Sequence, residues 1–214
     1  MRRIRKGREP KSWLEYRLST PGAKYEDAPK GDLRSALLAE QGYLCCYCMR
    51  SIDAKDTRIE HRLPRESYPE RQFSYSNLLA ACPGGEGLEP ELQHCDVSKK
   101  NQEITLDPAD PARDVEAIIR YSVSGAIESD DEQIRRDLDQ TLRLNLGWLK
   151  DKRQETLRGF QQGFERKHGG SWSADVVERE LKKWNEIPPG GHLAPYAGIV
   201  VHYLRKRLAR AGRR

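Results

Sequence analysis

The residue types best suited to chemistry are gathered in residues 44–101, which contain all five cysteines and several short polar motifs. Cys45 and Cys48 are separated by two residues, and this spacing lets one tight turn offer two thiolates to one ion. Cys82 and Cys95 could supply two further ligands and complete a tetrahedral site. The order of the cysteines therefore predicts a structural Zn²⁺ held by all four.

The thiols also allow other interpretations. Cys46 lies inside the turn and His94 precedes Cys95, so either residue could replace one of the four ligands. A disulfide pair or free buried thiols are further alternatives. The first ten residues, MRRIRKGREP, contain no apolar segment of the kind found in signal peptides. We therefore expect a cytoplasmic, reducing environment, which favours zinc over disulfides.

The segment R-I-E-H-R-L-P lies between the two halves of the cysteine set. We expect Ile59 to be buried on a short strand that ends with Glu60 and His61, whose side chains point to opposite faces. Hydrolysis of a phosphodiester needs a base that activates water and a divalent cation that neutralises charge. His61 suits the base and Glu60 suits the metal ligand. An isolated Glu-His pair would more often be a surface acid and a core histidine, but its place within the cysteine framework favours a site.

A third polar position lies in Y-S-N-L-L-A-A-C, where Asn77 precedes an apolar run. The Asn77 amide could bond backbone groups and fix the loop that carries His61. An ordinary turn or cap asparagine would show the same pattern.

The sequence D-V-S-K-K-N follows Cys95 and predicts the first turn of a helix, whose N-terminus favours anions. Asp96 and Asn101 could face a metal ion there, although Asp96 could equally serve only as a cap. Lys99 and Lys100, together with Arg62 beside the Glu-His pair, are our candidates for contacts with nucleic-acid phosphates. A lysine pair on a helix is more often only a solvated face.

The order of these motifs resembles that of the HNH endonucleases. The resemblance implies a ββα-metal fold that holds one catalytic divalent cation, Mg²⁺ or Mn²⁺, in many members beside a zinc bound by four cysteines. By position, His61 matches the general base, Asn77 the residue that orients it, and the stretch from Asp96 to Asn101 the third motif. The chain departs from the commoner pattern at Asp96, where many members have His, and at Glu60, where Asp is more usual. Which of Asp96 and Asn101 binds the metal stays open.

Longer segments resemble the HNH subunit of Septu-type and retron-associated antiphage systems, the PtuB-like proteins. The similarity covers residues 1 to about 108 and reappears in R-L-N-L and P-Y-A-G-I-V-V-H-Y-L-R-K-R-L. It implies an ABC-type ATPase as partner and, in retron versions, a reverse transcriptase with its DNA product. The implied substrate is nucleic acid, with DNA favoured and transfer RNA as an alternative.

The composition describes a soluble, highly solvated chain of 214 residues, with 36% hydrophobic and 33% charged residues. We expect no membrane span, because the chain lacks a stretch of about twenty apolar residues. The formal charge of +5 is concentrated at the two ends, both of which could contact phosphates, although basic tails also occur on proteins that bind no nucleic acid. These basic residues are Arg2, Arg3, Arg5, Lys6, Arg8 and Lys11, then Arg205, Lys206, Arg207, Arg210, Arg213 and Arg214.

The chain is expected to form an α+β, mostly helical fold in two parts. Residues 1–110 would be the nuclease domain with a basic N-terminal arm, and residues 111–214 a helical region that docks a partner. In the first part, the spacing predicts a helix over Leu33 to Gln41 with Leu33, Leu37 and Leu38 inside, ended by Gly42. Residues 83–93 are expected to form a loop.

The second part is expected to begin with a small hairpin that turns at Ser124-Gly125. Apolar residues then recur at helical spacing and predict one buried stripe. They are Ile134, Leu138, Leu142, Leu146, Leu149, Leu157, Phe160 and Phe164. Gly169-Gly170 and Pro188-Pro189-Gly190-Gly191 would flank a helix around Val177, Leu181 and Trp184, and the last helix would bury Val200, Leu204 and Leu208.

Two other functions fit the same residues. A zinc-knuckle module could bind nucleic acid without cutting it, or an adaptor could use the zinc only to hold a platform for other subunits. The complete set of Glu60, His61, Asn77 and the Asp96-to-Asn101 stretch favours the nuclease. His168, His192 and His202 have no cysteine or paired acid at ligand spacing, and we assign them no role.

Overall fold

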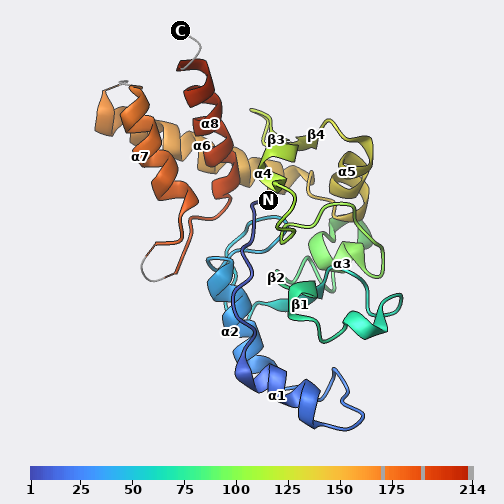
Figure 1. The fold of residues 1–214 in the computed structure, drawn as a ribbon. Coiled ribbons are helices and arrows are strands. Elements are labelled where there is room, and N and C mark those ends of the chain that lie inside the picture. The colour runs from blue at the N-terminus through green and yellow to red at the C-terminus, as the bar shows by residue number, and fades with distance from the viewer. Residues whose placement is uncertain (170–171, 189–190, 212–214) are drawn as a thin grey trace.

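The computed structural model describes residues 1–169, 172–188 and 191–211 and shows a mixed α+β fold (Figure 1). The strands form two separate antiparallel pairs, and helices make up most of the remaining regular structure. This agrees with the mixed class expected from the sequence. Some residues named in the sequence-based predictions lie outside the described ranges. They are Gly170, Pro189, Gly190, Arg213 and Arg214.

The N-terminal helices α1 (Lys11–Ser19) and α2 (Lys30–Glu40) pack against each other at one end of the molecule (Figure 1). Helix α2 begins three residues before the expected start and ends one residue before the expected end. It buries Leu33, Leu37 and Leu38 as predicted. Gly42 follows with φ +61°, and a Cβ there would lie 2.6 Å from Cδ1 of Leu193. Gly42 therefore allows both the left-handed turn and the close approach of the later chain.

The first sheet pairs β1 (Arg58–His61) with β2 (Leu78–Ala81), and the short helix α3 (Cys95–Lys99) follows. In the register, Glu60 lies opposite Leu79. All four residues of β2 are buried, so this strand runs through the core. The Gln41 side chain holds β2 by bonding both the N–H and the carbonyl oxygen of Ala80, each at 2.8 Å.

The predicted hairpin is present as β3 (Ile119–Tyr121) and β4 (Ile127–Ser129), after the short helix α4 (Val115–Ile118). Gly125 has φ +77°, which fits the predicted turn at Ser124-Gly125.

The predicted single stripe is interrupted between two helices. The chain forms α5 (Glu132–Arg136) and a π-helical turn (Asp137–Thr141), and then leaves helical geometry before α6 (Gly147–His168). The break has two structural causes: Arg143 adopts φ +49°, and the Asn145 side chain bonds both backbone groups of Ile127. The expectation of one continuous stripe was therefore wrong across residues 142–146.

Helices α6, α7 (Ala174–Asn185) and α8 (Ala197–Ala211) form a second core. This core contains Leu157, Phe160, Phe164, Val177, Ile199, Val200 and Leu204. The predictions of a helix around Val177 and of inward-facing Val200 and Leu204 are confirmed. None of the helices within the described ranges has the length and apolarity needed to cross a bilayer.

The larger core contains buried residues from both sides of position 110, from Met1 to Tyr196. The N-terminus lies near the middle of the molecule (Figure 1). The division into residues 1–110 and 111–214 stays a prediction.

Candidate functional site

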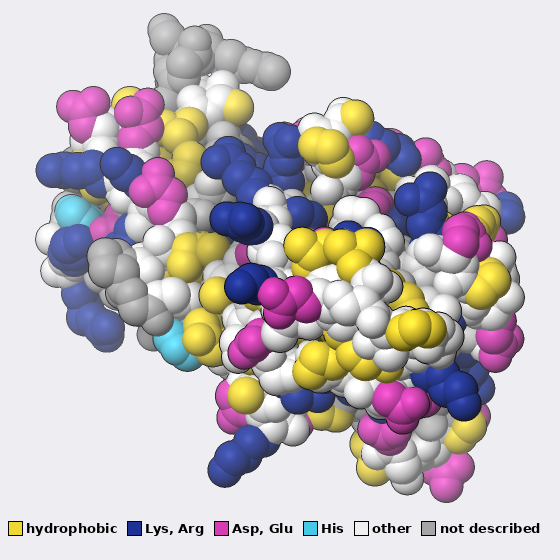
Figure 2. Space-filling view, turned by 60° about the horizontal axis from the view of Figure 1, so that its bottom comes forward, with side chains coloured by type: hydrophobic (Ala, Val, Ile, Leu, Met, Phe, Trp, Pro, Cys, Tyr) yellow, Lys and Arg dark blue, Asp and Glu magenta, His cyan; other side chains and the backbone are white. Residues whose placement is uncertain are grey.

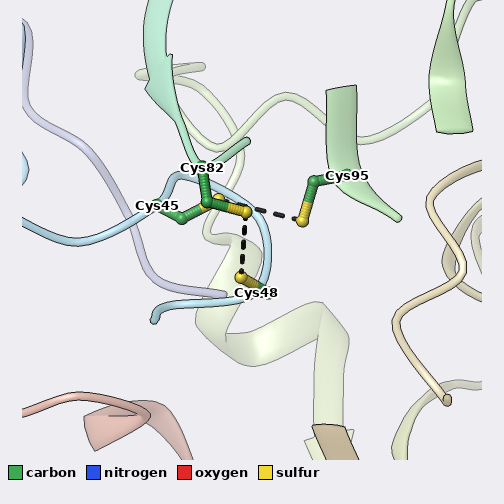
Figure 3. A group of neighbouring side chains, drawn as sticks. All are labelled: Cys45, Cys48, Cys82 and Cys95. Carbon is green, nitrogen blue, oxygen red and sulfur yellow. Dashed lines mark hydrogen bonds between the residues drawn. The ribbon is translucent and has the colours of Figure 1, made fainter. Parts of the chain in front are cut away.

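The four predicted cysteines form a buried cluster, and their sulfur atoms all lie within 4.8 Å of one another (Figure 3). Cys45 Sγ lies 3.8 Å from Cys95 Sγ, and Cys48 Sγ lies 3.7 Å from Cys82 Sγ. Sulfur atoms at the corners of a tetrahedron with Zn–S bonds of about 2.3 Å lie at such separations, whereas a disulfide bond measures about 2.05 Å. The donor set and its geometry therefore suit a structural zinc.

The turn that carries Cys45 and Cys48 has backbone bonds that hold both thiols inward. Cys45 N–H donates to the Arg50 carbonyl at 2.9 Å, and Met49 N–H donates to the Cys45 carbonyl at 3.1 Å. Met49 has φ +65°, which closes the turn. We call residues 44–51 the knuckle.

Cys46 and His94 lie outside the four-sulfur group. Burial raises the pKa of the Cys46 thiol, and its backbone N–H bonds the Ala80 carbonyl of β2. His94 is buried with Nε2 3.7 Å from Cys82 Sγ, so it can donate a hydrogen bond to that sulfur. The arrangement favours the four clustered cysteines, and neither Cys46 nor His94, as the metal ligands.

The cluster also has the electrostatics of a cation site. Burial opposes the Cys45 thiolate, yet hydrogen bonds from the neighbouring thiols lower its pKa. Burial and the bond to Cys45 raise the pKa of Cys95. The pKa of Cys48 is lowered as well, whereas that of Cys82 is raised, so the thiols do not ionise equally. A divalent cation would allow all four to ionise together.

Glu60 on β1 and Asp96 on α3 form a second group of ligand-type atoms. Glu60 is buried, and burial together with the hydrogen bond that its protonated carboxyl donates to Asp96 raises its pKa well above the usual value. Asp96 is also largely buried, but its bonds to Glu60 and to Arg58 Nε at 2.7 Å hold its pKa below the usual value. Two adjacent carboxyl groups that share a proton are suited to hold a divalent cation in its place.

His61 has a neutral, fixed imidazole. Burial lowers its pKa from 6.5 to about 4. Its Nε2 lies 3.0 Å from the Gln72 carbonyl oxygen, to which the ring can donate only as the Nε2–H tautomer. That tautomer leaves Nδ1 as the basic nitrogen. The Tyr25 ring packs on the imidazole in a T-shaped arrangement, with 4.7 Å between ring centroids.

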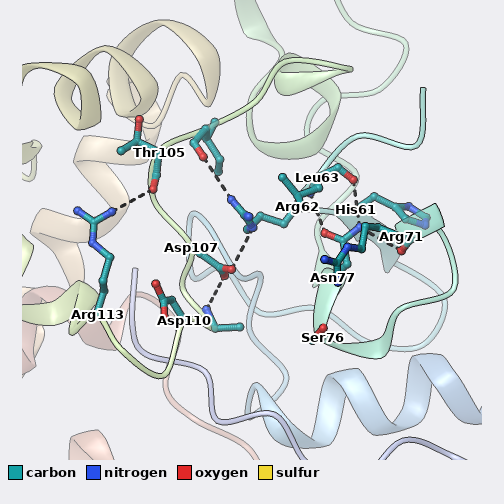
Figure 4. Close-up of polar contacts among 12 residues, drawn as sticks. His61, Arg62, Leu63, Arg71, Ser76, Asn77, Thr105, Asp107, Asp110 and Arg113 are labelled. Atoms are coloured by element: carbon teal, nitrogen blue, oxygen red, sulfur yellow. Dashed lines mark hydrogen bonds and ion pairs between the residues drawn. The ribbon is translucent and has the colours of Figure 1, made fainter. Parts of the chain in front are cut away.

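Asn77 makes the backbone bonds that its position suggested (Figure 4). Its Oδ1 accepts from Leu63 N–H at 2.8 Å, and its Nδ2 donates to the Leu63 carbonyl at 3.0 Å. Its own carbonyl accepts from Arg62 N–H at 3.0 Å. Asn77 therefore holds the segment that follows His61, although its role in orienting the imidazole stays a prediction.

A surface cavity of about 420 Å³ brings the remaining candidates together. Glu60, His61, Asp96 and Asn101 line it, and Lys100 lies at the same cavity. Asn101 and Lys100 are exposed, whereas Glu60 and His61 are buried at its inner wall. Ile59, expected to be buried, is only half-buried, whereas Glu60 and His61 are both buried.

Lys99 does not lie on the surface, contrary to the expectation that it contacts a phosphate. Its side chain is 1% exposed, and Nζ lies 3.0 Å from both Glu60 Oε1 and the His61 carbonyl oxygen. Arg62 is half-buried and forms an ion pair with Asp107 at 3.0 Å (Figure 4). Of the three cations proposed for phosphate contacts, Lys100 is the exposed one.

Sequence reasoning missed Tyr47 and Arg58. Tyr47 Oη donates to Glu60 Oε1 at 2.6 Å from its place between the knuckle cysteines, and no spacing rule indicated this contact. Arg58 bonds Asp96 and also Glu86 at 2.8 Å. Its position two residues before Glu60 was a usable signal, because such residues share one face of a strand.

The basic ends of the chain are partly engaged within the molecule. Arg2 donates to the Asn185 carbonyl and Arg3 to the Pro111 carbonyl, each at 2.7 Å, while Arg205 pairs with Glu116 at 2.5 Å. Figure 2 shows Lys and Arg side chains interspersed with Asp and Glu over the face in view. The termini therefore do not leave all of their positive charge free for a polyanion.

Fold and site together define a mixed α+β protein with a four-cysteine cluster that could hold a metal ion. No model of a known protein family matches the chain. The chain is 29% identical over 83 residues to a protein of Vibrio cholerae serotype O1 biovar El Tor named "Retron Vc95 putative HNH endonuclease". This match covers 37% of the chain and 39% of that protein, so it spans less than half of either.

Proposed function

We propose that the protein is a metal-dependent HNH endonuclease that hydrolyses phosphodiester bonds of nucleic acid. The observation that carries the proposal is the single cavity lined by Glu60, His61, Asp96 and Asn101. The similarity to a retron protein with HNH endonuclease in its name supports it. In this proposal β1, β2 and α3 are the ββα-metal core, and the zinc held by the four cysteines braces it.

His61 acts as the general base in the proposed reaction. Its imidazole is neutral at pH 7, and the Nε2–H bond to Gln72 leaves Nδ1 to take a proton from water. Asn77 holds the adjoining backbone, so the ring keeps its place when it gains charge.

Glu60 and Asp96 are the proposed ligands of the catalytic cation, and Asn101 offers a further oxygen from the same cavity. When bound, Mg²⁺ or Mn²⁺ neutralises charge on the scissile phosphate and the leaving 3′ oxygen. Lys100, exposed at the cavity, would contact a neighbouring phosphate.

We further propose that the nuclease is the effector of a cytoplasmic antiphage complex with an ABC-type ATPase, docked through residues 111–214. A reverse transcriptase and its DNA product join the complex in the retron version of this proposal. DNA is the favoured substrate and transfer RNA the alternative. The support is the PtuB-like sequence pattern and the retron named in the similar protein.

The test uses wild type, His61→Ala and His192→Ala, each with plasmid DNA, single-stranded DNA and transfer RNA, in Mn²⁺ or in chelator. His192 stacks on Tyr43 in a loop and has no proposed role, so its loss controls for removal of an imidazole. We expect Mn²⁺-dependent cleavage by wild type and His192→Ala, and a loss of at least about 100-fold in His61→Ala.

Undiminished cleavage by His61→Ala would overturn the assignment of the base. Binding of nucleic acid without cleavage by any variant, with the ATPase subunit present, would instead support the zinc-knuckle binding module. If Glu60, His61 and Asn77 could all be replaced without any effect on the assembled complex, the adaptor would be supported.

A further inference from the structure

The buried ammonium of Lys99 joins the two residues of the Glu-His motif to α3. Its Nζ lies 3.0 Å from Glu60 Oε1 and 3.0 Å from the carbonyl oxygen of His61. Because the side chain is 1% exposed, these two acceptors take the place of the hydrogen bonds that water would make to Nζ. Lys99 therefore fixes the position of α3 relative to the end of β1.

A second donor, Tyr47, also contacts Oε1 of Glu60. Tyr47 precedes Glu60 in the sequence, whereas Lys99 follows it. Tyr47 Oη, on the knuckle, donates to Glu60 Oε1 at 2.6 Å. Lys99 Nζ and Tyr47 Oη thus both lie within hydrogen-bond distance of Oε1 of Glu60. Glu60 lines the cavity beside Asp96, and its Oε2 remains for the bond with Asp96 or for a cation that replaces the shared proton.

We propose that Lys99 is a positioning residue for the catalytic cation. Together with Tyr47 it holds Oε1 of Glu60, so that Glu60 presents Oε2 to the ion beside Asp96. The hydrogen bond from Lys99 Nζ to the His61 carbonyl oxygen also holds the backbone of His61 next to Glu60. This inference rests on the proposed function, because it assumes that Glu60 and Asp96 hold a divalent ion.

The chain contains a matched arrangement away from the cavity. Lys6 forms an ion pair with Glu40 and donates to the Leu78 carbonyl of β2 at 2.9 Å, while Tyr75 Oη donates to Glu40 at 2.8 Å. Lysine, glutamate, tyrosine and a strand carbonyl recur, but neither Lys6 nor Glu40 lines the candidate active-site cavity. A purely structural role predicts the same consequences at both positions.

The experiment measures Mn²⁺ binding by electron paramagnetic resonance of the zinc-loaded full chain without nucleic acid. The variants are Lys99→Met and Tyr47→Phe, with Lys6→Met and Tyr75→Phe as their matched controls. Loss of a group that orients a metal ligand typically weakens metal affinity about 10- to 100-fold. We expect Lys99→Met to raise the Mn²⁺ Kd at least about tenfold and Tyr47→Phe to raise it by a smaller factor. Both controls keep the wild-type Kd, even where their unfolding temperature falls.

The outcomes distinguish failure of the Lys99 positioning role from failure of the proposed metal site. A wild-type Kd in Lys99→Met, or an equal loss of affinity in Lys6→Met, would overturn the positioning role while leaving the metal site intact. Wild type that binds no Mn²⁺ would overturn the metal site and this inference with it. If Lys99→Met does not fold, Tyr47→Phe decides, and an unchanged Kd in that variant counts against the proposal.

Discussion

Burial shifts the pKa values of the adjacent residues Glu60 and His61 in opposite directions. The imidazole of His61 is kept neutral, with its pKa lowered by burial to about 4. The carboxyl group of Glu60 has its pKa raised, because burial and Asp96 both disfavour its charge. Burial thus leaves the imidazole able to accept a proton, and it leaves the Glu60 carboxyl in a place where a nearby cation would favour its charged form.

Replacing Asn77 by Ala should reduce both stability and cleavage. The change removes two hydrogen bonds to the Leu63 backbone and leaves buried groups unpaired, at a cost of about 1–3 kcal/mol. Asn145 provides the control, because its side chain bonds both backbone groups of Ile127 in the same way. Chemical denaturation and a cleavage assay would compare the variants.

We expect Asn77→Ala and Asn145→Ala to be destabilised by similar amounts, with cleavage reduced only in Asn77→Ala. If the two variants lost cleavage equally at a temperature where both are folded, Asn77 would have only a structural role.

Local spacing was enough to predict that Cys45 and Cys48 share one turn, and the ligand count of four then nominated Cys82 and Cys95, which tertiary packing brings to that turn. The same reasoning could not place Lys99, because α3 has only five residues and shows no periodicity that reveals its buried face. Tyr47 was missed for a related reason. Its partner Glu60 is set by tertiary packing of the knuckle against β1, which no neighbouring residue encodes.

At the scale of elements, the end of α2 determines how the later chain approaches the knuckle. Gly42 turns the chain with φ +61°, and its carbonyl accepts from Leu193 N–H at 3.0 Å. The Leu193 side chain packs where a Cβ of residue 42 would lie. One glycine thus ends a helix and provides the contact surface for Leu193, which lies 151 positions later in the chain.

Gly42→Ala should be more destabilising than Gly22→Ala. Both glycines have a left-handed conformation, at φ +61° and +65°, so each alanine pays a similar backbone strain of about 1–2 kcal/mol. Only the Cβ at position 42 meets another residue, which adds about 1–3 kcal/mol of overpacking. Thermal unfolding of the two variants measures the difference, and equal melting temperatures would contradict the close approach to Leu193.

The helix boundaries show where sequence periodicity stops being informative. The predicted α2 and the β3–β4 hairpin are present because each depends on a local apolar pattern and a glycine. The run from Ile134 to Phe164 keeps helical spacing, yet its first half packs in the larger core and its second half in the smaller one. The chain turns at residues 142–146, so the residues before and after the turn pack in different cores. The spacing of apolar residues along the sequence does not show where such a turn occurs.

At the scale of the whole molecule, the knuckle connects the N-terminal core to the C-terminal helices. Cys46 N–H bonds the Ala80 carbonyl of β2, and the Met49 carbonyl accepts from Tyr196 N–H at 2.8 Å, just before α8. Met49 also shares a small apolar cluster with Leu193. The knuckle that carries Cys45 and Cys48 therefore contacts both β2 and the segment that leads into α8.

If the four cysteines hold zinc as proposed, its removal should loosen the attachment of α8 as well as the cysteine cluster. Structural zinc sites commonly supply much of the folding energy of the segments that bind them, so the knuckle should lose its shape in chelator. Hydrogen exchange would then show faster exchange at the amides of Leu193 and Tyr196, which bond Gly42 and Met49. The Val177 amide, which bonds Ser173 at the start of α7, provides the control and should keep its protection. Unchanged exchange at Leu193 and Tyr196 in zinc-free protein would show that the C-terminal helices are held independently of the metal centre.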